Sequence, residues 1–142
     1  MTLQGGKIMT ELLKNDAAGK LILRLCVGGL MLFHGISKLT NPGSVDFIGS
    51  KLADTGLPEA LAYGVYVGEI IAPLMIIIGL LCRAGAAVIV VNMLFAIFLV
   101  NSGDILALTD HGGWRLELQG FYLFGGLALC FLGSGKYAWK PD

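Results

Sequence analysis

The chain has 142 residues, of which 56% are hydrophobic and 14% are charged, and its net charge is zero. A soluble domain carries about 25% charged residues, so this composition excludes an ordinary soluble domain and indicates a protein that lies in lipid. The sequence has no basic tract of the kind that binds nucleic acid, so we expect the lipid bilayer as a partner and no nucleic acid.

The N-terminal part of the chain changes from mixed to apolar. Ile8, Leu12 and Leu13 fall at helical spacing among charged residues, which predicts a short helix on the membrane surface. The nearly continuous apolar run 21–39 follows. As a helix it reaches roughly 28 Å, close to the thickness of the hydrocarbon core. We therefore interpret it as the first membrane span and not as a cleaved signal.

Helix-breaking residues divide the rest of the chain. The segment 40–43 ends the first span, and residues 44–55 have the amphipathic pattern of an interfacial helix. Three more apolar segments are long enough to be spans: 60–81, 84–100 and 114–132. The sequence therefore predicts an all-α fold, an integral membrane bundle of four transmembrane helices with a short interfacial helix after the first span.

We divide the chain into three parts and orient it by its basic residues. The parts are a cytoplasmic or interfacial segment 1–19, a four-helix membrane domain 20–137 and a tail 138–142. If the N-terminus is inside, the ten Lys and Arg residues divide seven inside against three outside. This excess predicts that both termini are cytoplasmic. The outside set is Lys38, Lys51 and Arg115; the inside set is Lys7, Lys14, Lys20, Arg24, Arg83, Lys136 and Lys140.

Polar side chains inside the spans indicate a site. A charged residue in a span is costly, so it is by default a functional-site hypothesis. Counted at 1.5 Å per residue from the outer ends of the spans, a set of such residues falls in the outer half of the bundle. We predict that they line a polar pocket open to the outer face: His34, Lys38, Glu69, Asn92, Glu117 and Gln119.

Glu69 is the strongest candidate in this set. It falls near the middle of the membrane, where an unpaired carboxylate is too costly, so it either finds a cation or takes up a proton. A pair with Lys38 or protonated His34 is typical of an ion or proton relay, and such a site can also hold the head of a quinone or a small acid. Pro73, which lies four residues after Glu69, is expected to kink the helix and free the Glu69 carbonyl.

Each pocket residue also has a purely structural interpretation. His34 and Asn92 can bond to neighbouring helices, and Lys38 can extend to the outer headgroups. Glu117 can pair with Arg115 at the outer rim.

Two further arginines lie at the inner rim in this scheme. We interpret Arg24 as an inner-rim anchor and Arg83 as a signal that sets the topology.

The sequence shows no motif for most cofactors. Cys26, Cys82 and Cys130 map to the inner half without a CxxC pair, so no dithiol relay is expected. Only one histidine lies in a span, which argues against a haem held by two histidines of one subunit. We recognise no haem, nucleotide or metal motif, and a quinone is the cofactor class that stays open.

A series of motifs resembles the DoxX family. In chain order they are Arg24 followed by FHGISKL (33–39), GLP (56–58), GEIIAP (68–73), GLLCR (79–83), GGWRLELQG (112–120) and GSGKY (133–137). The positions that match the family are Arg24, His34, Gly35, Lys38, Glu69, Arg83 and Glu117. The resemblance covers about 20–137 and implies a small inner-membrane protein of bacterial type with four helices. Relatives are subunits of a thiosulfate:quinone oxidoreductase or associate with thiol and superoxide stress proteins.

Three functions follow from the residues and the resemblance. The first is a membrane subunit or partner in quinone-linked redox metabolism, with a redox-protein partner or as a homo-oligomer. This leaves open whether the chain is itself an enzyme or a non-catalytic, quinone-binding oxidoreductase subunit. The second is a small proton-coupled transporter or permease subunit with Glu69 as the carrier. The third is a structural membrane anchor in which the polar residues only specify helix packing.

Overall fold

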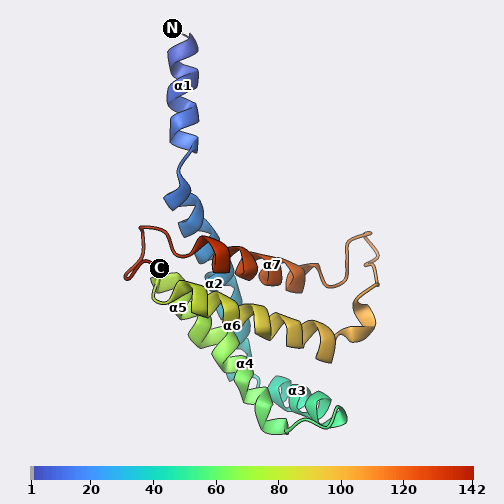
Figure 1. Cartoon of the computed structure of the whole chain (residues 1–142). Coiled ribbons are helices and arrows are strands. Elements are labelled where there is room, and N and C mark those ends of the chain that lie inside the picture. Colours follow the sequence, from blue (N-terminus) through green and yellow to red (C-terminus); the bar gives the residue numbers. More distant parts are fainter. Residues whose placement is uncertain (1) are drawn as a thin grey trace.

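The computed structural model describes residues 2–142, which are helical and contain no β-strand, as predicted (Figure 1). Helix α1 (Thr2–Leu13) extends away from the bundle, and α2 (Asp16–Thr40) continues from it into the core. The short helix α3 (Gly43–Asp54) follows α2, close to the predicted range 44–55. Helix α2 begins earlier than the predicted span because the Asn15 side chain accepts a hydrogen bond from the Ala18 amide and caps it.

The second long helical stretch is built from several pieces. It runs through η1 (Glu59–Tyr63), α4 (Gly64–Tyr66), the π-helical turn η2 (Val67–Ile71) and α5 (Ala72–Ile78). The π-helical turn ends at Ile71, two residues before Pro73, where the sequence predicted a kink.

The last two helices of the bundle lie side by side (Figure 1). Helix α6 (Cys82–Phe95) continues into the π-helical turn η3 (Ala96–Val100). A loop containing the short η4 (Ser102–Asp104) leads to α7 (Glu117–Leu132), which returns along α6.

Among the described residues, three helical stretches are long and apolar enough to cross a membrane, namely 16–40, 59–78 and 82–100. The fourth predicted span is a shorter apolar helix, because α7 begins at Glu117 and not at Trp114. The Trp114 indole donates a hydrogen bond to the Ile105 carbonyl at 2.7 Å and so belongs to the preceding loop. The 16 residues of α7 reach about 24 Å at 1.5 Å per residue.

Two hydrophobic clusters hold the elements together. The larger joins α2, α5, α6 and α7 and consists of Val27, Met31, Ala72, Ile76, Cys82, Ala86, Ile89, Met93, Tyr122 and Leu129. The smaller packs α3 against η1 and α4 and consists of Val45, Leu52, Ala62 and Val65. Helix α3 is therefore anchored to the bundle by a core of its own.

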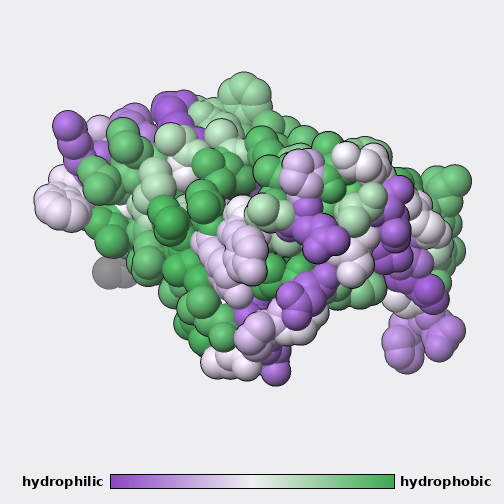
Figure 2. Space-filling model, turned by 90° about the horizontal axis from the view of Figure 1, so that it is seen from below, coloured by the Kyte–Doolittle hydropathy of each residue, from purple (hydrophilic) through white to green (hydrophobic). Residues whose placement is uncertain are grey.

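The outside of the bundle is strongly apolar. Large side chains such as Phe33, Phe98, Phe121 and Phe131 are exposed. Figure 2 shows extensive hydrophobic surface on the face it presents, with many of the hydrophilic residues gathered towards the right. Exposed apolar surface of this extent is stable in lipid and not in water.

Candidate functional site

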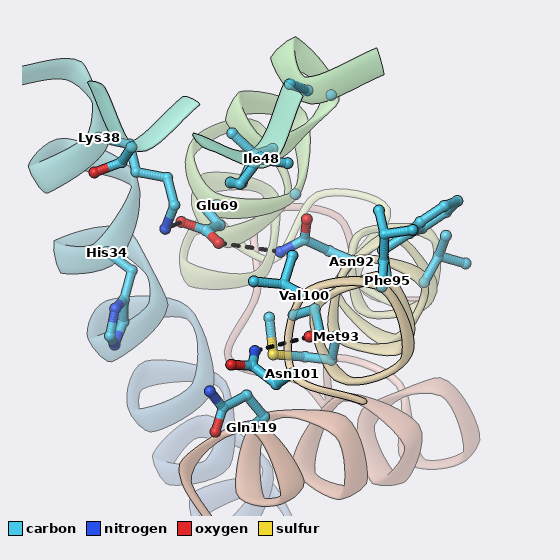
Figure 3. Close-up of a pocket in the computed structure, with 18 of the residues that line it drawn as sticks. His34, Lys38, Ile48, Glu69, Asn92, Met93, Phe95, Val100, Asn101 and Gln119 are labelled. Carbon is cyan, nitrogen blue, oxygen red and sulfur yellow. Dashed lines mark hydrogen bonds and ion pairs between the residues drawn. The ribbon is translucent and has the colours of Figure 1, made fainter. Parts of the chain in front are cut away.

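A cavity of about 780 Å³ lies between α2, α3, the stretch from η1 to η2, α6 with η3, and the start of α7 (Figure 3). Most of the residues that line it are apolar. Five of the six predicted pocket residues also line it: His34, Lys38, Glu69, Asn92 and Gln119. A mostly apolar cavity of this size with a few polar groups is typical of a small-molecule site.

A buried ion pair forms part of the polar lining. The Lys38 ammonium is 2.7 Å from Oε2 of Glu69, and the Asn92 amide donates to Oε1 of Glu69 at 3.3 Å. The side chain of Glu69 is only 7% exposed, so this carboxylate depends on its two partners. Gly68 makes room for Asn92, because a Cβ on Gly68 would lie 2.6 Å from Cγ of Asn92.

The backbone of Glu69 is also in close contact with α2. Pro73 has no N–H to bond the Glu69 carbonyl. In the π-helical turn the Ala72 amide bonds Val67 instead of Gly68. The Glu69 carbonyl lies against Gly35, where a Cβ would be 2.7 Å from the carbonyl carbon and would overlap the oxygen. Gly35 therefore allows the approach that brings Glu69 to Lys38.

Breaking the ion pair is expected to destabilise the bundle. Lys38→Met removes the cation and leaves the buried Glu69 carboxylate with Asn92 alone. We expect a loss of about 2 kcal/mol, below the roughly 3–5 kcal/mol for a fully buried pair because the Lys38 side chain is 20% exposed. Adding Glu69→Gln should recover most of this loss, since no buried charge is then left. Thermal unfolding in detergent measures both variants, and equal stability of the single and double variants would contradict the prediction.

His34 and Gln119 line the cavity from different helices. The His34 ring meets the Tyr122 ring edge-on, with centroids 5.7 Å apart and an interplanar angle of 87°. Gln119 lies on α7 three residues before Tyr122, so the two share a face of that helix.

Glu117 is not brought to the cavity. It is exposed at the first position of α7 and does not belong to the cavity lining. Its carboxylate lies beside Gly113, where a Cβ would be 3.0 Å from Oε2. Arg115, the rim residue expected to be able to pair with Glu117, instead pairs with Asp104 at 3.3 Å. The start of α7 at Glu117 places this side chain on the loop side of the helix.

Arg24, which the sequence predicted as an inner-rim anchor, has a fully buried side chain. The guanidinium donates to the Ile76 and Ile77 carbonyls, each at 2.9 Å, in the last turn of α5. It also donates to the carbonyls of Ser134 and Tyr137 in the segment that follows α7. Carbonyls at a helix C-terminus have no partner within the helix and attract a cation. Arg24 therefore joins three segments of the chain.

Arg83 has a similar role at the end of α7. It is exposed, consistent with a rim position, and its guanidinium donates to the carbonyls of Cys130 and Phe131 at 2.6 and 2.9 Å. Its backbone amide donates to the carboxylate of Asp142. These contacts give Arg83 a packing role in addition to the topological one that the sequence indicated.

The sequence did not identify α3 as part of the cavity wall. Phe47, Ile48 and Leu52 line the cavity, although their apolar pattern predicted only contact with the membrane interface. The sequence feature that could have indicated this position is the short connection between α2 and α3, which consists of Asn41 and Pro42. A link this short holds α3 beside the end of α2.

The described residues offer little to a metal ion. Within 2–142 no three His, Cys, Asp or Glu side chains form a group that could hold one. The three cysteines are free thiols, with Cys82 buried and Cys26 exposed.

Comparison with known proteins places the chain in a family. Residues 19–102 match the sequence model described as DoxX. The chain belongs to the DoxX family. It is also 34% identical over 129 residues to a protein of Bacillus subtilis (strain 168) named "Putative oxidoreductase CatD", covering 90% of this chain and 89% of that relative. No solved structure matches the chain.

The matched range shows which part of the cavity the family model describes. It extends from α2 to η3 and includes His34, Lys38, Glu69 and Asn92, whereas Gln119 and Tyr122 on α7 lie beyond it. Together with the apolar helices, the family assignment makes this DoxX protein a membrane protein whose outer surface lies in lipid.

Proposed function

We propose that this DoxX protein is a membrane subunit or partner in quinone-linked redox metabolism, and that its cavity binds the head of a quinone. The observation that carries the proposal is the cavity of about 780 Å³, apolar except for the Lys38–Glu69–Asn92 group and a few further polar side chains. A quinone head is a flat apolar ring with hydrogen-bond-accepting oxygens, and it needs this combination of walls and donors. The name of the relative agrees with a redox role.

We further propose that the chain crosses a bacterial inner membrane several times, with both termini in the cytoplasm. The distribution of Lys and Arg supports this orientation. The cavity would then open to the outer side, and the ends of α5 and α7 held by Arg24 and Arg83 would face the cytoplasm. In this arrangement segment 1–19 lies at the inner surface, 20–137 forms the membrane domain and 138–142 is a cytoplasmic tail.

A purely structural anchor is less well supported. If the polar residues only specified helix packing, they would form a closed set with no cavity reaching His34. His34 instead lines the cavity. A proton-coupled carrier is the second candidate, favoured by the buried Lys38–Glu69 pair. Uptake into proteoliposomes that contain only this protein would support the carrier and would argue against a purely redox role.

Quinone extraction tests the main proposal. The protein is purified in mild detergent, and its bound lipid is extracted and analysed for quinone. We expect near-stoichiometric quinone in the wild-type protein and several-fold less in Glu69→Gln. The one oxygen of Gln can still accept from Lys38, and the Asn92 amide can turn so that its oxygen accepts from the Gln NH2 group. The fold is therefore retained, but the side chain no longer holds the ammonium by charge.

Glu117→Gln is the matched control, because it makes the same change outside the cavity lining. It should retain wild-type quinone. Absence of quinone from the wild-type protein, or equal losses in the two variants, would refute the proposal. Native mass spectrometry of the same sample would report a redox-protein partner or a homo-oligomer.

A further inference from the structure

The ion-pair side of the cavity is organised around the Glu69 carboxylate. Glu69 accepts from both Lys38 and Asn92. An ionised carboxylate only accepts hydrogen bonds, and so does a quinone oxygen, so Glu69 cannot bond that oxygen directly. The carboxylate therefore holds its neighbours in place, and the hydrogen bonds to a quinone oxygen come from other side chains of the lining.

A second set of polar side chains lines the same cavity and has donors to offer. We call His34, Gln119 and Tyr122 the His34 group. Within residues 2–142, these three side chains make no hydrogen bond to another group, and no fully buried polar atom lacks a partner. Their polar atoms are therefore not fully buried, and all three side chains belong to the cavity lining. An imidazole, an amide and a phenol can each donate a hydrogen bond to an oxygen.

The fold presents the His34 group as one surface. The edge-on contact between His34 and Tyr122 fixes α7 against α2, and Gln119 lies one turn before Tyr122 on the same face. His34 lies one turn before Lys38 on α2, about 6 Å along the helix axis. In Figure 3, His34 and Gln119 lie in the lower part of the view and the Lys38–Glu69–Asn92 group lies above them.

We infer that the His34 group recognises the ligand and donates hydrogen bonds to one oxygen of a quinone ring that lies across the cavity. The Lys38–Glu69–Asn92 group forms the opposite edge of the site and positions the helices. This inference rests on the proposed function, because it names the residues that bind the quinone. Gln119 and Tyr122 lie outside the range matched by the family model, so this edge is a property of the chain that the match does not describe.

Binding of decylubiquinone to the lipid-free protein in detergent, measured by calorimetry, tests the inference. His34→Leu, Gln119→Leu and Tyr122→Phe should each weaken binding roughly three- to tenfold, the effect of one lost hydrogen bond. The thermal stability of Gln119→Leu and Tyr122→Phe should stay close to wild type, since neither side chain makes a hydrogen bond in the described chain, whereas His34→Leu also loses the ring contact with Tyr122. His34→Gln keeps a donor and should bind more tightly than His34→Leu.

The chain supplies matched controls. His111→Leu and Gln4→Leu make the same substitutions at exposed positions away from the cavity and should bind as wild type. If His34→Leu fails to fold, Tyr122→Phe carries the test, because it keeps the ring contact with His34 and removes only the hydroxyl. Binding by the wild type with undiminished affinity in all three variants overturns this inference and leaves the proposed function standing. Failure of the wild type to bind overturns the proposed function itself.

Discussion

Gly35→Ala is expected to lower the free energy of unfolding by about 3 kcal/mol and to reduce the yield of monodisperse protein. The added methyl group would overlap the Glu69 carbonyl and lie 2.6 Å from Cγ1 of Ile70. A side chain can change rotamer, but a backbone carbonyl inside a helix cannot move without displacing the helix, so the cost is at the upper end for overpacking. Thermal unfolding and size-exclusion chromatography in detergent measure the effect.

Gly29→Ala is the matched control on the same helix. A Cβ at Gly29 meets nothing within 4 Å. Alanine is also favoured over glycine inside a helix by roughly 0.5–1 kcal/mol, so this variant should be as stable as the wild type or slightly more stable. Equal behaviour of the two alanine variants would show that α2 and η2 do not approach each other as closely as the structure indicates.

Arg24→Met is expected to cost about 4 kcal/mol, the largest effect of any single change considered. The buried guanidinium donates four hydrogen bonds to backbone carbonyls at the end of α5 and in the segment that follows α7. Methionine fills similar space but leaves these carbonyls without a donor, and each unsatisfied buried group carries a penalty. The segment after α7 should detach, and faster proteolysis after residue 132 would report this directly.

Two further substitutions test whether the hydrogen-bond geometry of Arg24, and not the positive charge alone, stabilises the protein. Arg24→Lys keeps the charge but cannot reach all four carbonyls from one nitrogen, so its stability should lie between those of wild type and Arg24→Met. Arg115→Met removes an exposed arginine whose pair with Asp104 is 3.3 Å long, and it should change the stability by less than about 1 kcal/mol. A stable Arg24→Met variant with a protected segment after α7 would contradict the role assigned to Arg24.

Much of the architecture follows from local sequence pattern. Apolar runs of membrane length predicted the long helices, and Pro42, Gly56 and Pro58 bounded α3 closely. The shared depth of Glu69 and Asn92 also followed from counting residues, and the structure joins the two by a hydrogen bond. These features could be predicted because length, helical rise and chain breakers act on neighbouring residues.

The identity of the partners was decided only by the tertiary structure. The sequence left Lys38 and His34 as alternative partners of Glu69, and the structure pairs Glu69 with Lys38 and places His34 against Tyr122. It also removes Glu117 from the cavity, because the Trp114 bond to the loop moves the start of α7.

The sequence by itself determined that the protein is all-α and suited to lipid, because the apolar composition indicates the solvent and the length of each apolar run indicates a helix. It also predicted that several polar residues fall at similar positions along their helices. Only the tertiary structure showed that Arg24 is buried, that α3 closes the cavity wall and that Gly35 admits the Glu69 backbone. These features depend on the rotation and distance between helices far apart in the chain. Packing sets those quantities, and no local pattern of residues contains them.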